Sequence, residues 1–316
     1  MPTIDRDMTH DPPNNQELPL AAGIFTLFLC ALFGANAVAI KISLSGLGVF
    51  TTAALRFSLA SITLFLWAMA TGRPLRLKKG QARKLFMVAI LFTAQLGLFY
   101  LGLSKTSASR GTLMINLQPF FVLILAHFFI PGDEITRKKV LGLVMGFSGM
   151  ALVFLGKGEV TPDVQIGDLI ILSTAFLWAL NTVYTKRIIG AFPPFQIVLF
   201  PMALSVPCFF LCGYFLDPEM ITSVDTDVLL SLLYQGLVTA SFGFVAWNAM
   251  LKKYGAVSLH SFIFVMPVAG VLLGGLVLGE TITLEIALAL VLITSGIVVV
   301  NLKSRRYSPI FPQRGV

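Results

Sequence analysis

FGANAVAIK, residues 33–41, and WALNTVYTK, residues 178–186, repeat one pattern in two places. Both stretches carry an aromatic residue, a small residue, an asparagine and a terminal lysine at the same relative positions. Asn36 corresponds to Asn181 and Lys41 to Lys186, and the members of each pair are 145 residues apart. The two stretches therefore predict that one apolar helix bearing polar groups occurs twice in this chain.

The composition indicates a protein that lies within a lipid bilayer. Of the 316 residues, 56% are hydrophobic and 12% are charged, whereas a soluble domain has about 25% charged residues. The net charge of +8 does not indicate nucleic-acid binding, because that requires basic residues clustered on one face. Cys30, Cys208 and Cys212 lie in apolar runs and are interpreted as small core residues rather than a disulfide framework or metal site.

The fold class predicted from hydropathy is an all-α integral membrane protein with ten transmembrane helices. A helix needs about 20 mostly apolar residues to cross a bilayer core. Ten stretches meet that rule: 19–42, 49–70, 84–104, 110–130, 138–156, 167–188, 195–216, 228–250, 257–278 and 284–302. Residues 1–18 and 303–316 carry no such pattern and are predicted to be cytoplasmic tails, the first one disordered.

The distribution of basic residues predicts the orientation, because lysine and arginine collect in cytoplasmic loops. Eighteen of the 23 basic residues fall on one side of the ten spans, in both tails and in alternate loops. Nine of the 15 acidic residues fall on the other side. Both termini are therefore expected in the cytoplasm.

The second half of the chain copies the first at low resolution, which predicts two repeats, residues 19–156 and 167–302. The corresponding pairs include Phe50 with Phe195, Pro119 with Pro267, and Ser148-Gly149 with Ser295-Gly296. Each repeat has five spans, and an odd number of spans makes the second repeat inverted in the membrane. Inverted repeats are a construction of secondary transporters, which bind substrate near the bilayer midplane. The alternative is a duplicated membrane scaffold without transport.

Several motifs together resemble those of a known family. They are FGANAVAIK, AALRFSLA (53–60), LSKTSASRGTLMINLQPFF (103–121), WALNTVYTK and KKYGAVSLHSFIFVMPVAGVLLGGLVLGETIT (252–283). Over residues 19–302 the sequence resembles the EamA-type, ten-helix branch of the drug/metabolite transporter superfamily. The resemblance implies a bacterial inner-membrane carrier, often an exporter, of small metabolites such as amino acids or of toxic organic compounds. It also implies a central cavity between the halves, lined by the first four helices of each. In this chain Pro201 stands where a second copy of Arg56 would fall, so a symmetric role for a buried cation is in doubt.

Asn36 and Asn181 are the first candidates for the substrate pathway. An unpaired amide in hydrocarbon costs several kcal/mol, so each must face protein or a wet cavity. Phe33 shares a helical face with Asn36, and Trp178 shares one with Asn181. The alternative is that these amides join helices, and their paired occurrence favours the pathway.

Further candidates lie in the third, fourth and eighth spans. The predicted pathway residues there are Gln95, Phe99, Asn116, Trp247 and Asn248. Pro119 and Pro267 are expected to bend matched helices, because proline removes a backbone hydrogen bond and interrupted helices tend to mark binding sites. The alternative is that prolines are simply frequent in membrane helices.

The charged and titratable residues leave more alternatives open. Arg56 lies about two turns into its span, where it either contacts a substrate carboxylate or extends to the outer interface. Lys41 and Lys186 end their helices and suit the helix dipole, and Glu134 and Glu280 are expected to cap the helices that follow them. His127 and His260 fit a proton relay less well than interfacial packing. No Asp or Glu is assigned to a membrane core, so the sequence predicts no carboxylate proton carrier.

The motifs exclude several other function classes. There is no P-loop or GxGxxG motif, no catalytic constellation and no ligand spacing among the histidines, so we expect neither an enzyme nor a cofactor. Gly142-xxx-Gly146 and Gly270-xxx-Gly274 predict close helix packing within the monomer first and a homodimer interface second. The expected partners are a small-molecule substrate and the lipid bilayer, without nucleic acid.

Overall fold

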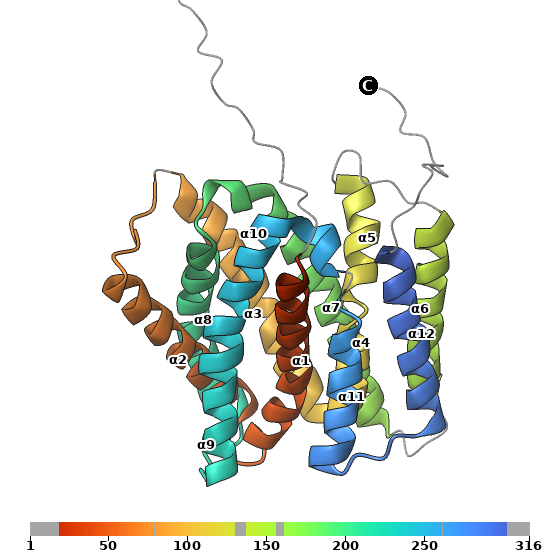
Figure 1. Ribbon diagram of the computed structural model, residues 1–316. Coiled ribbons are helices and arrows are strands. Elements are labelled where there is room, and N and C mark those ends of the chain that lie inside the picture. The colour runs from red at the N-terminus through yellow and green to blue at the C-terminus, as the bar shows by residue number, and fades with distance from the viewer. Residues whose placement is uncertain (1–18, 79, 130–136, 156–160, 261, 302–316) are drawn as a thin grey trace, which may run out of the picture.

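A computed structural model describes residues 19–78, 80–129, 137–155, 161–260 and 262–301, and its helices form one bundle (Figure 1). The first half contains α1 (Leu20–Ser43), α2 (Val49–Ala70), α3 (Gln81–Lys105), α4 (Ala108–Ile115), α5 (Gln118–Phe129) and α6 (Arg137–Leu155). The second half contains α7 (Pro162–Ile188), the 3₁₀ turn η1 (Ile189–Ala191), α8 (Pro194–Leu216), α9 (Thr226–Leu233), the π-helix η2 (Tyr234–Gly243), α10 (Phe244–His260), α11 (Val265–Leu278) and α12 (Leu284–Asn301).

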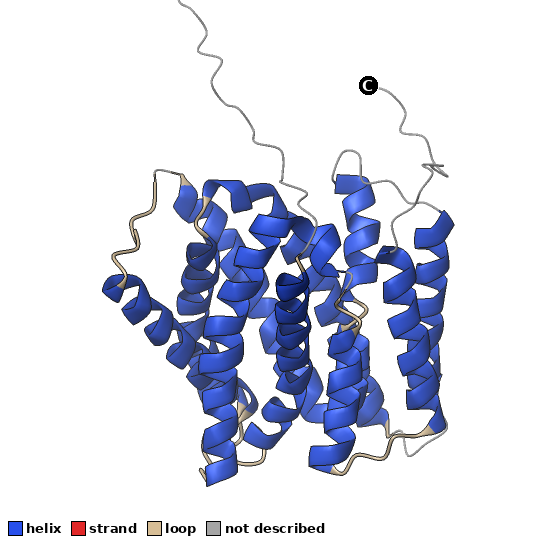
Figure 2. Ribbon diagram, viewed as in Figure 1, coloured by secondary structure: helices blue, strands red, loops and turns tan. Residues whose placement is uncertain are grey.

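The all-α prediction is confirmed for the part of the chain that the structure describes. Every regular element there is helical (Figure 2), and the β-type pairing consists of an isolated bridge between Leu47 and Ile221. Seven segments are long and apolar enough to cross a membrane: Leu20–Ser43, Val49–Ala70, Gln81–Lys105, Ala108–Leu125, Pro162–Ala191, Pro194–Leu216 and Thr226–Leu251. Val265–Leu278 and Leu284–Val300 are shorter apolar helices. The expected ten spans, the inverted repeats and the cytoplasmic termini stay predictions.

Two of the expected spans are not single α-helices. The stretch 110–130 is divided into α4 and α5, because the helix ends at Asn116 and a new one begins at Gln118. The stretch 228–250 consists of α9, the π-helix η2 and the start of α10. The α10 helix then continues to His260, past the expected start of the next span.

Each half places its first helix against the other half. The α7 helix packs along α3, α4 and α5, whereas α1 packs along α9, η2 and α11. The α6 and α12 helices pack against each other at one side of the bundle (Figure 1). The halves are therefore interlocked rather than separate.

The α3 and α7 backbones approach each other closely because two glycines meet there. A Cβ atom on Gly167 would lie 2.9 Å from the Gly102 carbonyl oxygen, and one on Gly102 would lie 3.0 Å from the Gly167 carbonyl oxygen. Side chains at either position would force the two helices apart. This contact sets the spacing of α3 and α7 near their ends.

The glycine motifs expected to pack helices within the monomer do so. Gly142 faces Gly296 of α12, and Gly270 faces Thr112 of α4. These surfaces are occupied by the chain's own helices, and the possible homodimer stays a prediction.

Many large apolar side chains point outward from the bundle, including Leu20, Phe215 and Leu276, each more than 70% exposed. An apolar exterior of this extent is unfavourable in water and suits lipid. The buried core contains Phe57, Tyr100 and many smaller residues, and polar side chains are set within it.

Candidate substrate pathway

Asn36 and Asn181 each form a hydrogen bond to the other half of the chain. The Thr239 hydroxyl of η2 donates to Asn36 Oδ1 of α1 over 3.1 Å and shares its proton with the Gln235 carbonyl of its own helix at 2.8 Å. The Asn181 amide of α7 donates to Gln95 Oε1 of α3 over 3.3 Å. In both cases an asparagine from the first helix of one half reaches the third span of the other half. The sequence predicted three of these four residues and missed Thr239.

Arg56 lies at the centre of a buried polar cluster, directed into the bundle and 2% exposed. Its Nη1 donates to the Tyr100 hydroxyl over 3.0 Å, and its Nη2 donates to the Thr239 hydroxyl over 3.2 Å. The guanidinium also lies 5.0 Å from the Phe57 ring and 6.0 Å from the Phe244 ring. The Nε atom is buried and has no hydrogen-bond partner.

Gln235 connects this cluster to α1. Its Oε1 accepts from the Tyr100 hydroxyl over 2.8 Å, and its Nε2 donates to Ser43 Oγ over 2.6 Å and to the Ala39 carbonyl over 3.1 Å. Gln235 and Thr239 both lie on the π-helix η2, a conformation frequent at functional sites. Sequence reasoning missed Tyr100, Gln235 and Thr239, although two polar residues four apart in an apolar span were a readable signal.

Aromatic rings form one side of the Arg56 cluster. Phe33 lies 5.7 Å from Phe244 and 6.0 Å from Trp247, measured between ring centroids. Phe33, Asn36, Phe244 and Trp247 are each partly exposed. Phe33, on the same helix as Asn36, thus packs among rings that include Trp247, and the role of these residues as walls of a pathway stays a prediction.

A second polar cluster surrounds Asn181. Its Oδ1 accepts from the Thr185 hydroxyl over 3.4 Å, and Gln118 Nε2 donates to the Thr182 hydroxyl over 3.1 Å. Trp178 is partly buried against the main core. This cluster holds amides and hydroxyls, in contrast to the cationic cluster around Arg56.

The remaining predicted pathway residues make no hydrogen bond to either polar cluster among the contacts described. Asn116 and Asn248 donate to carbonyls one turn earlier in their own helices, those of Thr112 and Phe244. Phe99 is buried beside Tyr100, with the two ring centroids 6.4 Å apart.

Pro119 and Pro267 occupy the first turns of α5 and α11. A proline is well tolerated there, because the first backbone N–H groups of a helix have no partner within that helix. The prolines were expected to bend continuous helices. Instead, α5 and α11 each begin just before their proline.

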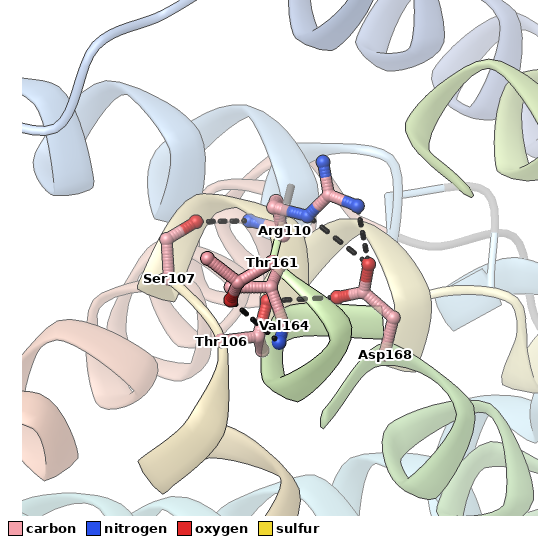
Figure 3. A network of polar contacts seen from close by, with 6 residues as sticks. All are labelled: Thr106, Ser107, Arg110, Thr161, Val164 and Asp168. Atoms are coloured by element: carbon pink, nitrogen blue, oxygen red, sulfur yellow. Dashed lines mark hydrogen bonds and ion pairs between the residues drawn. The ribbon is translucent and has the colours of Figure 1, made fainter. Parts of the chain in front are cut away.

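A buried ion pair lies at one end of the bundle. We call this end, where α1 ends and α2 begins, the distal end. Asp168 of α7 is fully buried, accepts from Arg110 Nε over 3.0 Å and from Arg110 Nη2, and accepts from the Thr106 hydroxyl over 2.7 Å (Figure 3). Asp168 lies in the second turn of α7, and the expectation that no acid lies in a membrane core stays a prediction.

Two more acids at the distal end cap helices of the first half. Glu280 accepts from the backbone N–H groups of Ala108 and Ser109, at 2.6 and 2.8 Å. The expectation that it caps the following helix was wrong, because it caps α4 instead. Asp217 likewise accepts from the N–H groups of Phe50 and Thr51 at the start of α2, at 3.1 and 2.8 Å.

Lys41 also acts on a neighbouring helix rather than its own. Its Nζ donates to the carbonyls of Leu103 and Thr106 at the end of α3, at 3.1 and 2.9 Å.

Glu134 lies outside the described residues, as does the side chain of His260. His127 is partly buried on α5. Among the described residues no group of three metal-binding side chains is found.

Comparisons with known proteins place the chain in a family of membrane transporters. The model of the EamA-like transporter family matches twice, over residues 21–155 and 165–302. An uncharacterized transporter of Archaeoglobus fulgidus is 29% identical over 85% of this chain and 94% of its own length. Proteins of Salmonella typhimurium and Escherichia coli, each named "Probable amino-acid metabolite efflux pump", are 24% identical over 87% of this chain and 93% of their own lengths.

A solved crystal structure supports the same fold. It matches with a TM-score of 0.68 and 19% identity, covering 89% of this chain and 98% of its own. The family model matches nearly all described residues, and the chain has the apolar helices that a membrane protein needs. The chain therefore belongs to the EamA-like transporter family and is a membrane-spanning transporter.

Proposed function

We propose that this chain is a secondary-active exporter of small metabolites such as amino acids, and that it works by alternating access in a bacterial inner membrane. Substrate would bind centrally, between the Arg56 and Asn181 clusters. The similarity to proteins named as amino-acid metabolite efflux pumps supports both the direction and the substrate class.

The organisation of the chain supports alternating access. The family model matches each half separately, as expected if two inverted five-helix repeats make up ten spans. The described chain begins and ends at the same end of the bundle (Figure 1), which fits an even number of spans with both termini in the cytoplasm. Two similar halves of opposite orientation can exchange conformations and so open to either side in turn.

The single observation that carries this proposal is the pair of asparagine hydrogen bonds between the halves. Asn36 accepts from Thr239, and Asn181 donates to Gln95. Asn36 and Asn181 occupy the same position in the first helix of their halves, and each bonds to the third span of the opposite half. Such bonds can be exchanged as the halves rock against each other, which a rigid scaffold does not require.

The distal contacts hold the two halves together at one end of the bundle. Asp168, Asp217 and Glu280 of the second half all bind groups of the first half at that end. With the termini in the cytoplasm, the distal end faces outward. In the proposed cycle these contacts would break when the protein opens to the outside.

Counterflow in proteoliposomes tests the proposal. Vesicles containing the purified protein are loaded with pooled unlabelled amino acids, and the uptake of labelled ones is measured. We expect exchange with the wild-type protein and its loss in the double variant Asn36→Ala with Asn181→Ala. A matched control removes one hydroxyl from each half, Thr63→Ala with Ser173→Ala, because both hydroxyls bond within their own helices.

Failure of amino-acid exchange would direct the test to nucleosides, vitamins and cationic drugs. Exchange of cationic drugs alone would establish the alternative, a multidrug exporter. If correctly folded protein exchanged none of these solutes, the transport mechanism would be wrong and a membrane scaffold would be the better description.

A further inference from the structure

We propose that the Arg56 guanidinium binds the carboxylate of the transported molecule, so that this chain selects small carboxylic acids, amino acids included. The inference rests on the transport function proposed above and names the substrate class of that site. It begins from a difference between two buried arginines, Arg56 and Arg110.

The two arginines present the same edge to different partners. Arg110 directs Nε and Nη2 at the Asp168 carboxylate. On the same edge of Arg56, Nη2 donates to the Thr239 hydroxyl and Nε has no partner. Arg110 has its carboxylate in Asp168, whereas among the described residues no carboxylate forms a hydrogen bond or ion pair with Arg56.

A buried cation without an anion is strongly unfavourable. The Tyr100 and Thr239 hydroxyls accept hydrogen bonds from Arg56 but bring no net negative charge. The guanidinium has five N–H donors in a planar fork that matches a carboxylate. Because Nε–H and one Nη2–H lie on one edge, a carboxylate can bind them side by side, taking the place of the Thr239 hydroxyl at Nη2, and supply the missing charge.

The surroundings favour a monoanion with an apolar part. Arg56 is the cation of this cluster, and its other described hydrogen-bonding members, Asn36, Tyr100, Gln235 and Thr239, are uncharged. Lys41 is turned to the end of α3 by its two carbonyl acceptors. One positive charge balances one carboxylate, whereas a phosphate dianion would leave excess negative charge in a nonpolar setting. A cationic drug would be repelled.

The partly exposed residues on one side of the Arg56 cluster are Phe33, Asn36, Phe244 and Trp247, and the proposal has substrate approach past them. These four residues are partly exposed, and the Phe244 ring lies 6.0 Å from the Arg56 guanidinium. The Asn36 amide lies next to Thr239, which itself contacts Arg56. In this proposal the carboxylate reaches the guanidinium past Asn36, and the apolar part of the substrate packs against the rings.

Paired ligands that differ only in the charged group test the inference. The probes are phenylalanine and leucine with their amides, two simple monocarboxylates (lactate and pyruvate), and inorganic phosphate. Binding is measured by titration and by the shift in melting temperature in detergent, and exchange is measured by counterflow. We expect the carboxylates to raise the melting temperature and to exchange, and the amides and phosphate to do neither.

Three variants separate a substrate contact from a structural one. Arg56→Met should weaken carboxylate binding by at least about thirtyfold, and Arg56→Lys should weaken it less, because it keeps the charge but loses the fork. Without ligand, Arg56→Met should melt at the same temperature or higher, because it removes an uncompensated buried cation. Arg73→Met, the same change at an exposed arginine that lies over Trp67, should keep wild-type affinity.

The outcomes distinguish this inference from the proposed function. If Arg56→Met melts well below the wild type yet keeps carboxylate affinity, Arg56 is structural and the inference is wrong. Equal binding of the amides, or Arg56-dependent exchange of phosphate, would also overturn it. If carboxylates stabilise the protein through Arg56 but no solute exchanges across vesicles, the inference stands and the proposed transport mechanism fails.

Discussion

Asp168 of α7 and Arg110 of α4 form an ion pair at the distal end of the bundle, and the Asp168 side chain is fully buried. The pair joins the two halves of the chain just beyond the place where Gly102 and Gly167 bring α3 and α7 together. Thr106 completes the coordination of the carboxylate. The pair therefore contributes to closure at the distal end.

Removing one partner of this pair should be more harmful than removing both. Asp168→Asn leaves the Arg110 charge uncompensated in a buried position, which should cost about 3–5 kcal/mol of stability. The double variant Asp168→Leu with Arg110→Met should lose less than either single change. Thermal unfolding in detergent of the two single variants and the double variant measures the coupling. Additive losses would mean that the pair does not act as a unit.

Glu280 and Asp217 should each stabilise the helix that they cap, although that helix lies far from them in the sequence. Glu280→Gln weakens acceptance from two N–H groups at the start of α4 and should cost about 1 kcal/mol. Asp217→Asn should cost at least as much, because Asp217 accepts two N–H groups and the Thr51 hydroxyl. Melting temperatures in detergent provide the measurement. Glu219→Gln, at an exposed position on the same side, is the control and should leave the melting temperature unchanged.

The glycine contact between α3 and α7 should not tolerate a side chain. In Gly167→Val the new Cβ would lie within 3 Å of the Gly102 carbonyl oxygen and of the Lys105 side chain, so overpacking should cost about 1–3 kcal/mol. Gly190→Ala is the matched control, since no atom lies within 4 Å of the added carbon. Thermal unfolding compares the two, and equal losses would show that α3 and α7 can separate without cost.

The orientation can be tested with single cysteines on a background where Cys30, Cys208 and Cys212 are replaced by alanine. Glu219→Cys, in the loop after α8, should react with a membrane-impermeant thiol reagent in intact cells. Arg76→Cys, in the loop after α2, should react only after the membrane is permeabilised. Mass spectrometry or a gel-shift reagent measures the labelling. The reverse pattern would place the termini outside.

Helix positions were the part of the structure most accessible from the sequence. Apolar length alone predicted α1, α2 and α8 to within two residues at each end. It could not predict that the eighth span contains a π-helix, because η2 has the same apolar composition as the α-helices around it. The interruption at Asn116 was signalled only by the nearby Pro119, which was interpreted as a bend within one helix.

The sequence identified the amide side chains of the candidate site but not its hydroxyl side chains. Asn36 and Asn181 were identifiable because an amide in an apolar helix must find a partner. Tyr100 and Thr239 looked like ordinary membrane-helix residues, since a hydroxyl can bond within its own helix. Their role depends on Arg56, which comes from a different helix, so only the three-dimensional packing could reveal it. Glu280 shows the same limit, because the helix that it caps lies about 170 residues earlier in the chain.

The capping contacts at the distal end also provide built-in reporters. The amide protons of Phe50, Thr51, Ala108 and Ser109 are held by carboxylates from the other half of the molecule. Any movement that separates the halves there must break these four hydrogen bonds and expose the N–H groups to solvent, although α2 and α4 stay folded. Hydrogen–deuterium exchange at these positions, compared with amides in the middle of the same helices, would therefore report how often the distal end opens, with no label and no known substrate.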